Sequence, residues 1–385
     1  MEFRDTPSQA EWRTEVRTFL KNEKPPQLPA DGSFEGTPDN ESAMKKWRTT
    51  LASRGWIAPA WPREYGGAGL GVVEQFIMNE EFAEARAMQM GGSGVGFLGP
   101  TLITYGNDDQ KKEHLSRILS GESQWCQGYS EPGSGSDLAS LQTRAIRDGD
   151  DFVINGQKIW TSGAHQANWM FMLARTDPDA PKHRGISYFL LDMKTPGISV
   201  RPLINMAGRH GFNEVFFEDV RVPAKNVVGD VNRGWYIGAT TLDFERSSIG
   251  SAVGQRQTIE TYINYVKANK LGTPNVRREF AERWIETAAA RLMSYRVISI
   301  QAAGRVPNHE ASIAKLYNSE LSQRIARTAM GAFGMIGGIT DPARAPLSGR
   351  AAMSYMSTVA STIAGGTSEV QRNVIATRGL GLPRA

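Results

Sequence analysis

The sequence contains few of the residues that disulfides and most metal sites require. It has 1 cysteine, Cys126, and 5 histidines, which are scattered without a ligand-like spacing. A single cysteine excludes a disulfide framework and a cysteine-built metal site, and it is typical of a reducing compartment. Because Cys126 lies at the start of an apolar run, we expect it to be a packing residue. We predict no bound metal.

Long hydrophobic runs and a strong charge bias are also absent. No apolar stretch reaches the roughly 20 residues that a transmembrane helix needs. The net charge is +4 over 385 residues, and lysine and arginine are spread along the chain without a basic stripe. The first residues, MEFRDTPSQAEWRTEV, are charged and amphipathic and lack the apolar core of a signal peptide. We therefore expect a cytoplasmic protein with no nucleic-acid or membrane partner.

The spacing of apolar residues changes twice along the chain. Helical spacing of apolar residues dominates 1–122, short strand-like runs dominate 123–230, and long helical segments return in 231–385. Within the first part, Asn107 followed by Gln110 resembles a helix cap with its N3 partner, and it predicts a helix from there to Leu119. The last part contains four such segments, at about 235–268, 276–304, 308–332 and 350–378, which favour a helical bundle. We predict an α+β multidomain protein: a helical N-terminal domain, a middle β-barrel or sandwich domain and a C-terminal four-helix bundle.

The rest of the chain is organised around residues 125–163. A short alternating run there breaks into a Gly/Ser loop that ends at Asp137 and carries hydroxyls at Ser130, Ser134 and Ser136. Such a loop exposes backbone N–H groups and admits close approach by a polar planar ring or a phosphate. The dipeptides Asp148-Gly149 and Asn155-Gly156 further on each predict a tight hairpin turn. An ordinary surface loop fits the same letters, and the residues alone leave both interpretations open.

Two more segments also combine glycine with hydroxyl-bearing residues. Trp160-Thr161-Ser162-Gly163 stands at a predicted strand end, and Gly365-Gly366-Thr367-Ser368 interrupts a helical pattern near the C-terminus. The second leaves free N–H groups at the start of the following helix, where the helix dipole favours an oxyanion or an electron-rich ring. A plain N-cap by Thr367 or Ser368 explains the same residues without a ligand.

A carboxylate in the first predicted bundle helix is a candidate base. Glu245 shares a helix face with the apolar residues Leu242 and Ile249, whereas Asp243 points to a different face. Apolar surroundings raise the pKa of a carboxyl toward the pH at which it can remove a weakly acidic C–H proton. A solvated glutamate, or one paired with Arg246, is the alternative.

Five segments in order resemble signatures of the acyl-CoA dehydrogenase family of flavoproteins: YGNDDQKKEHLSRILSGE, GYSEPGSGSD, DDFVINGQKIWTSGAHQANW, NEVFFEDVRVPAKNVVG and GGTSEVQRNVIATRGLGLP. The resemblance runs essentially end to end. It implies FAD between the middle and last domains, an acyl-CoA substrate, electron-transfer flavoprotein as acceptor, and tetramers built as a dimer of dimers. The implied reaction is α,β-dehydrogenation, in which a carboxylate takes the α-proton of the thioester and the β-hydrogen leaves as hydride to the flavin.

The resemblance assigns roles by position. The flavin-contacting residues it implies are Gln127, Tyr129, Ser130, Gly135, Ser136, Trp160, Thr161, Ser162, Thr367, Ser368 and Glu369. Among them, Ser136 also lies toward the CoA ligand.

The implied base departs from the commonest family pattern. Most members have glutamate immediately before the Gly-Thr of the C-terminal motif, where this sequence has Gly365. A minority place the base on the first bundle helix just before an arginine, and Glu245-Arg246 falls there. The resemblance therefore implies Glu245 as catalytic base, Gly365 as a backbone N–H donor, and Asp243 and Arg246 along the path of the substrate and CoA. Glu369 is the second choice of base.

Two further departures concern assembly and substrate. The family elements that reach a neighbouring subunit's FAD in homotetramers appear here in altered form at 268–272 and 331–337. The resemblance is thus compatible with a homodimer or homotetramer and with a heterotetramer that contains a second acyl-CoA dehydrogenase subunit. For the substrate, we expect a bulky, branched, cyclic or steroid-type acyl group. Alternatives on the same fold are an acyl-CoA oxidase or flavin monooxygenase, and a non-catalytic subunit of a heteromer.

Overall fold

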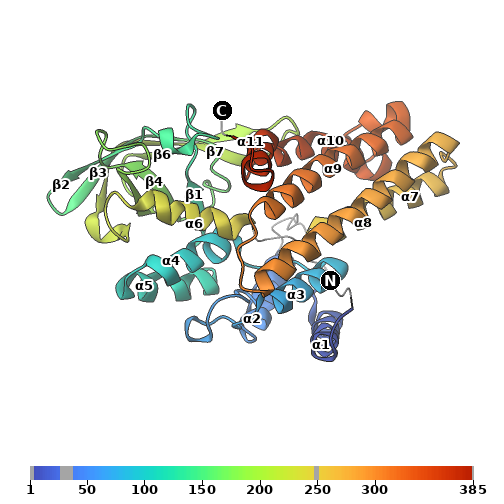
Figure 1. Ribbon diagram of the computed structural model, residues 1–385, viewed down its shortest axis with the longest axis horizontal. Coiled ribbons are helices and arrows are strands. Elements are labelled where there is room, and N and C mark those ends of the chain that lie inside the picture. Colours follow the sequence, from blue (N-terminus) through green and yellow to red (C-terminus); the bar gives the residue numbers. More distant parts are fainter. Residues whose placement is uncertain (1–3, 27–37, 247–250, 384–385) are drawn as a thin grey trace. The chain divides into compact units, whose positions relative to one another are not determined.

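Helices open and close the chain and strands form its middle part (Figure 1). The structure is a computed structural model that describes residues 4–26, 38–246 and 251–383, with the side chains of 38, 242–246 and 251 excepted. Its helices and strands are α1 (Pro7–Glu23), α2 (Pro38–Ala52), α3 (Val72–Glu84), α4 (Gly99–Tyr105), α5 (Asp108–Ser120), β1 (Trp125–Gly128), β2 (Arg144–Asp148), β3 (Asp151–Lys158), β4 (Trp169–Arg175), β5 (Ile186–Asp192), β6 (Ile198–Ile204), β7 (His210–Pro223), β8 (Val227–Val228), α6 (Gly234–Arg246), α7 (Ser251–Ala268), α8 (Pro274–Ala302), α9 (His309–Phe333), α10 (Arg350–Ser361) and α11 (Ser368–Val374).

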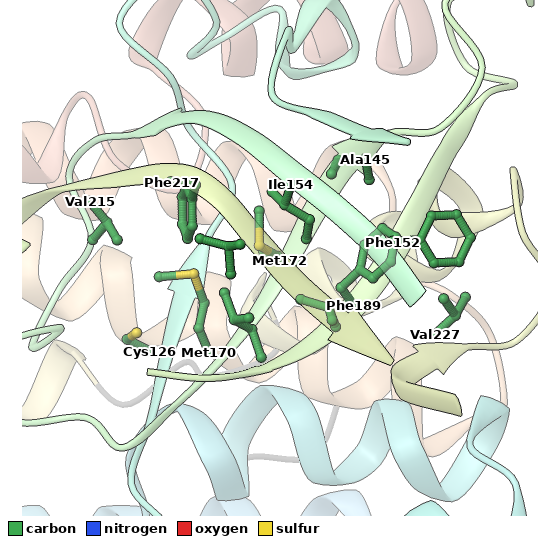
Figure 2. Packing of buried hydrophobic residues seen from close by; sticks show 14 of the residues in the cluster. Cys126, Ala145, Phe152, Ile154, Met170, Met172, Phe189, Val215, Phe217 and Val227 are labelled. Carbon is green, nitrogen blue, oxygen red and sulfur yellow. The ribbon is translucent and has the colours of Figure 1, made fainter. Parts of the chain in front are cut away.

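The strands form one sheet in the order β6-β7-β3-β2-β4-β5-β8, with β1 parallel to β4. Strands β4 and β5 are buried along almost their whole length, as expected for a strand covered on both faces. Figure 2 shows the side chains of this core, which include Cys126, Ala145, Phe152, Ile154, Met170, Met172, Phe189, Val215, Phe217 and Val227. Cys126 is fully buried here, which confirms its packing role, and burial raises the pKa of its thiol to about 12.

One of the two predicted hairpin turns is wrong. The chain turns between β2 and β3 beside Asp148-Gly149, but β3 runs straight through Asn155 and Gly156. A bulge in the β3–β7 ladder lies between Ile154 and Gly156. A Cβ on Gly156 would lie 2.6 Å from the Thr143 Oγ1 atom, so glycine is required here by close approach rather than by a turn.

The helical predictions hold in part. The segment predicted over 235–268 corresponds to α6 and α7, and 247–250 lie outside the described residues. Asn107 caps α5 as predicted: its Oδ1 accepts from Gln110 N–H at 2.9 Å, and Gln110 Oε1 accepts from Asn107 N–H at 3.3 Å. In the C-terminal bundle α9 packs against α7, α8, α10 and α11. The segment predicted as one helix over 350–378 is divided into α10 and α11, because Gly365 and Gly366 adopt φ angles of 63° and 87°, outside the helical range.

The chain comprises two compact units, each described by itself. The first contains Met1–Gly36, Gly71–Met88 and Arg246–Ala385, and the second contains Thr37–Leu70 and Gln89–Glu245. Among the described residues, no helix is both long enough and apolar enough to cross a bilayer.

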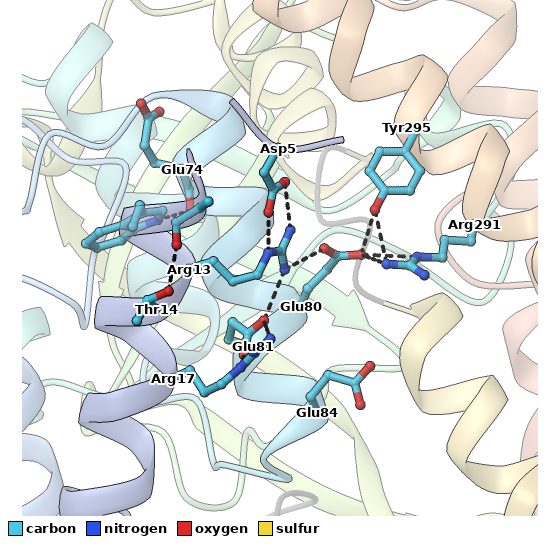
Figure 3. A network of polar contacts seen from close by, with 12 residues as sticks. Asp5, Arg13, Thr14, Arg17, Glu74, Glu80, Glu81, Glu84, Arg291 and Tyr295 are labelled. Atoms are coloured by element: carbon cyan, nitrogen blue, oxygen red, sulfur yellow. Dashed lines mark hydrogen bonds and ion pairs between the residues drawn. The ribbon is translucent and has the colours of Figure 1, made fainter. Parts of the chain in front are cut away.

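A network of charged side chains ties α1, α3 and α8 together in the first unit (Figure 3). Glu80 and Glu81 are buried on α3. Arg13 contacts both carboxylates at 3.1 Å, Arg17 contacts Glu81 at 2.9 Å, and Arg291 contacts Glu80 at 3.1 Å. Buried carboxylates are retained only when paired, and these pairs fix the packing of the two N-terminal helices on the bundle helix.

Candidate active site

The first candidate segment is the loop that follows β1. Residues 129–137 fold back on themselves, because Glu131 N–H donates to Ser134 O at 2.9 Å and Ser134 N–H donates to Glu131 O at 3.0 Å. The buried Ser134 hydroxyl donates to the carbonyls of Asp137 and Leu138 at 2.9 and 3.2 Å. Ser134 therefore shapes the loop, and its hydroxyl is already occupied.

The predicted site residues of this loop differ in exposure. Tyr129 is buried, and its ring packs edge-on against Phe171 with a centroid separation of 5.9 Å. Ser130 is half-buried, whereas Gly135 and Ser136 are exposed. On β1, the Nε2 atom of Gln127 is buried and has no hydrogen-bond partner among the described residues.

The second candidate segment, residues 160–162, lies beside this loop. Ile159 N–H donates to Ser130 O at 2.9 Å, which joins the two segments directly after β3. Trp160 adopts a left-handed φ of 58° and is 59% exposed. Such a conformation costs a non-glycine residue on the order of 1–3 kcal/mol, so the surrounding contacts must enforce it.

Those contacts centre on Thr161 and Asn213, both fully buried. Thr161 N–H donates to Asn213 O at 3.0 Å, and Asn213 Nδ2 donates to Thr161 O at 3.0 Å. The Asn213 amide also lies 3.1 Å from His165 Nδ1 and 2.8 Å from His210 Nε2, and the two imidazoles stack with centroids 4.0 Å apart. Ser162, by contrast, is exposed.

Beneath the loop lies a buried ion pair that sequence reasoning missed. Lys158 Nζ is 2.8 Å from Glu131 Oε1, and the Lys158 side chain is fully buried. Burial lowers the pKa of Lys158 to about 8, against the opposing charge of Glu131. Burial raises the pKa of the Glu131 carboxyl, but Lys158, Thr143 and the backbone N–H of Gln142 together outweigh it, and the pKa is lowered from its ordinary value. The missed signal is a lysine at an inward position of a strand whose Phe152 and Ile154 face the core.

The third candidate segment belongs to the other unit and precedes α11. Thr367 is the N-cap of α11, and its Oγ1 accepts from Val370 N–H at 3.2 Å. Lys315 Nζ donates to Gly366 O at 2.6 Å and holds the turn. Ser368 is buried, and its hydroxyl has no hydrogen-bond partner in the described ranges. The capping interpretation of Thr367 is thus confirmed, and the Ser368 hydroxyl stays available to a ligand.

The two remaining predicted residues near this turn are exposed. Gly365 adopts a left-handed φ of 63°. Glu369 lies in the first turn of α11, where its own backbone N–H and the Thr367 hydroxyl lower the pKa of its carboxyl. A lowered pKa keeps this carboxylate ionised at neutral pH and makes it a weaker base. An apolar environment has the opposite effect, because it raises the pKa of a carboxyl.

The predicted base falls at the edge of the described structure. Asp243, Glu245 and Arg246 occupy the last turn of α6, and their side chains lie outside the described residues. The preceding turns are described: Ile237 is 3% exposed and Thr241 is fully buried. Position 245 follows them at four-residue spacing and shares their face of the helix.

The residues of the second unit fit a flavin. Thr161 Oγ1 and Gln127 Nε2 are buried polar atoms there without hydrogen-bond partners among the described residues. Buried polar atoms are almost always satisfied in folded proteins, so two unsatisfied ones in segments already selected from the sequence indicate groups that a ligand completes. Ser368 Oγ is a further atom of this kind in the first unit. Hydroxyl and amide donors suit the carbonyl and nitrogen acceptors of an isoalloxazine ring.

Three family profiles match consecutive parts of the chain. They describe the acyl-CoA dehydrogenase N-terminal domain at residues 6–122, the middle domain at 126–220 and the C-terminal domain at 232–380. The chain therefore belongs to the acyl-CoA dehydrogenase family and is an oxidoreductase.

Individual relatives match along the whole length. The acyl-CoA dehydrogenase IpdE1 of Mycobacterium tuberculosis is 36% identical over 381 residues, which covers 97% of this chain and 98% of the relative. Among solved structures, the Tcur3481-Tcur3483 steroid ACAD superposes with a TM-score of 0.87 at 33% identity. The ChsE4-ChsE5 complex from Mycobacterium tuberculosis superposes with a TM-score of 0.84 at 33% identity. Both structural matches cover 100% of this chain and 100% of the other chain.

Proposed function

We propose that this chain catalyses FAD-dependent α,β-dehydrogenation of an acyl-CoA thioester to the trans-2-enoyl-CoA, with a steroid-type or similarly bulky acyl group. The observation that carries the proposal is the pairing of the loop at Ser130 with the segment that contains Thr161, whose buried hydroxyl has no hydrogen-bond partner among the described residues. When bound, FAD supplies the acceptor for the hydride that leaves the β-carbon.

The proposed flavin contacts come from three segments. The first comprises Gln127, Tyr129, Ser130, Gly135 and Ser136, with Ser136 also toward CoA. Trp160, Thr161 and Ser162 form the second, and Thr367, Ser368 and Glu369 form the third. The contacts that fix the loop and the Thr161 turn support this assignment, because a site held by its own scaffold orients a ligand without reorganisation.

We propose Glu245 as the base that takes the α-proton. The buried face that Ile237 and Thr241 define on α6 supports this role, since position 245 continues it. Gly365 is proposed to donate its backbone N–H to the thioester oxygen, which acidifies the α-carbon by stabilising the developing enolate charge. Asp243 and Arg246 are proposed to line the path of the acyl chain and CoA.

The substrate class is supported by two observations. One structural relative is described as a steroid ACAD, and it is similar to this chain from end to end. The second is Gly365, which stands where the family resemblance implies that most members carry a glutamate, and the missing side chain is proposed to make room for a bulky acyl group.

We also propose a heteromeric assembly in the cytoplasm. Two structural relatives are described by pairs of names, Tcur3481-Tcur3483 and ChsE4-ChsE5, and the second is described as a complex. The altered elements at 268–272 and 331–337 support a second acyl-CoA dehydrogenase subunit as partner, with a homodimer or homotetramer as the alternative. Electron-transfer flavoprotein is the proposed electron acceptor.

The test is an anaerobic titration of the purified protein with a panel of CoA thioesters carrying steroid side chains, branched chains and straight chains. The proposal predicts loss of the flavin's visible absorbance and formation of an enoyl-CoA that has lost H₂, fastest with the steroid thioesters. Rapid peroxide formation in air without an added acceptor would instead indicate an oxidase. If FAD is gained only on co-expression with a second subunit, and thioesters still leave it oxidised, the chain is a non-catalytic partner.

A further inference from the structure

The charged pair under the loop, Lys158 and Glu131, is more completely buried than ordinary ion pairs. The Lys158 side chain is 0% exposed and the Glu131 side chain is 7% exposed. Lysine is almost never fully buried unless a partner compensates its charge. An apolar pair of similar volume is often as stabilising as a buried ion pair or more so, so general stability gives little reason for these residues.

The pair connects three separate segments of the β domain. Glu131 Oε1 accepts from Thr143 N–H at 2.9 Å, and Glu131 Oε2 accepts from Gln142 N–H at 2.6 Å, directly before β2. Lys158, the last residue of β3, donates to Glu131 and also to Tyr129 O at 3.0 Å. The ammonium therefore holds the loop by a side chain and by a backbone carbonyl at once.

The contact with Tyr129 O sets the direction of one peptide group. A trans peptide is planar, and its C=O and N–H point in opposite directions. Since the Tyr129 carbonyl points at the buried Lys158 ammonium, the N–H of Ser130 points away from it. The neighbouring groups are engaged within the protein: Ser130 O accepts from Ile159 N–H, and Glu131 N–H donates to Ser134 O.

We propose that Lys158 and Glu131 are positioning residues that orient the Tyr129–Ser130 peptide, so that the Ser130 N–H faces the flavin. This inference rests on the proposed FAD site. Glu131 keeps the ammonium charged and in place, and Lys158 fixes the peptide plane. A charge-assisted hydrogen bond is stronger than a neutral one and restricts the plane more tightly.

Three variants separate positioning from general stability. Lys158→Met leaves the Glu131 carboxylate buried and unpaired. Glu131→Gln leaves Lys158 without its counter-charge. The double variant removes both charges together, so it is expected to recover part of the thermal stability that Lys158→Met loses. It still lacks the donor to Tyr129 O, so its flavin site is expected to stay impaired.

The measurements are the melting temperature without flavin, the dissociation constant for added FAD and the visible spectrum of bound flavin. We expect the double variant to melt above Lys158→Met but to bind FAD about tenfold more weakly than the wild type, which corresponds to about 1.4 kcal/mol. Its flavin bands should also shift. Arg221→Ala removes an exposed pair with Asp148 in the same domain and is the matched control, expected to leave all three readouts unchanged.

Two outcomes would overturn the inference, and they are distinguishable. If the wild type binds FAD and the double variant binds it equally tightly with an unchanged spectrum, the pair does not position the loop, and the FAD site stands. If the wild-type chain, with any partner subunit present, binds no FAD, the proposed function fails and this inference fails with it.

Discussion

Asn213 and Thr161 are joined by two hydrogen bonds, one in each direction, both 3.0 Å long and both fully buried. These two bonds join the start of strand β7 to the segment that follows β3. Trp160, in its left-handed conformation, directly precedes Thr161. The strained backbone at Trp160 is thus held by a side-chain amide that comes from 52 residues further along the chain.

Replacement of Asn213 tests this link. We expect Asn213→Ala to lower the free energy of unfolding by about 2 kcal/mol, because the Thr161 carbonyl loses its buried donor. Asn213→Asp should be at least as harmful despite its equal size, since a carboxylate cannot donate to that carbonyl. Urea unfolding measures both, with exposed Gln166→Ala as the control. Equal stability of Asn213→Asp and wild type would contradict the account.

The charged network of the first unit gives a second prediction. Glu81, whose side chain is 4% exposed, pairs with Arg13 and Arg17. Because Glu81→Gln removes the charge of this buried group, we expect it to lower the free energy of unfolding by about 2 kcal/mol. Glu84 pairs with Arg256 but its side chain is 44% exposed, so Glu84→Gln should cost less than about 1 kcal/mol. Urea midpoints of the two variants compare them directly. Identical midpoints would show that burial of the pair is irrelevant.

The lowered pKa of Glu131 predicts a dependence of stability on acid. Because the folded-state pKa lies below the ordinary value of 4.5, the folded form holds this proton less tightly than the unfolded chain does. The resulting stabilisation is fully present above pH 4.5 and is lost as the pH falls through the folded-state value. The difference in melting temperature between wild type and Glu131→Gln should therefore be largest near neutral pH and shrink in acid. A difference in melting temperature that grows on acidification would contradict this prediction, because it would mean that the folded-state pKa of Glu131 is raised.

Much of the fold follows from local pattern. The alternation in 123–230 predicted the β domain, and the Asn107–Gln110 spacing predicted the start of α5. The predicted helices at 276–304 and 308–332 match α8 and α9 within two residues at each end. These features depend on neighbours one to four positions apart, which the sequence displays directly.

The features that sequence reasoning missed depend on distant partners. Glu131 meets Lys158 from 27 residues away, and Asn213 meets Thr161 from 52 residues away. Asn155-Gly156 has the letters of a hairpin, but the pairing of β3 with the distant strand β7 continues past it, from Ile154 to Lys158. The flavin-site residues were selected by resemblance to a family, and their roles, that of Glu245 above all, stay predictions.

The central claim is that Glu245 removes the α-proton, and two matched variants test it most directly. Glu245→Gln and Glu369→Gln each replace one carboxylate by its neutral isostere. Each is mixed anaerobically with the best acyl-CoA of the panel, and flavin absorbance is followed after equal FAD content has been verified. We predict that Glu245→Gln retains FAD but is not bleached, while Glu369→Gln is bleached. Bleaching of Glu245→Gln at the wild-type rate would contradict the account.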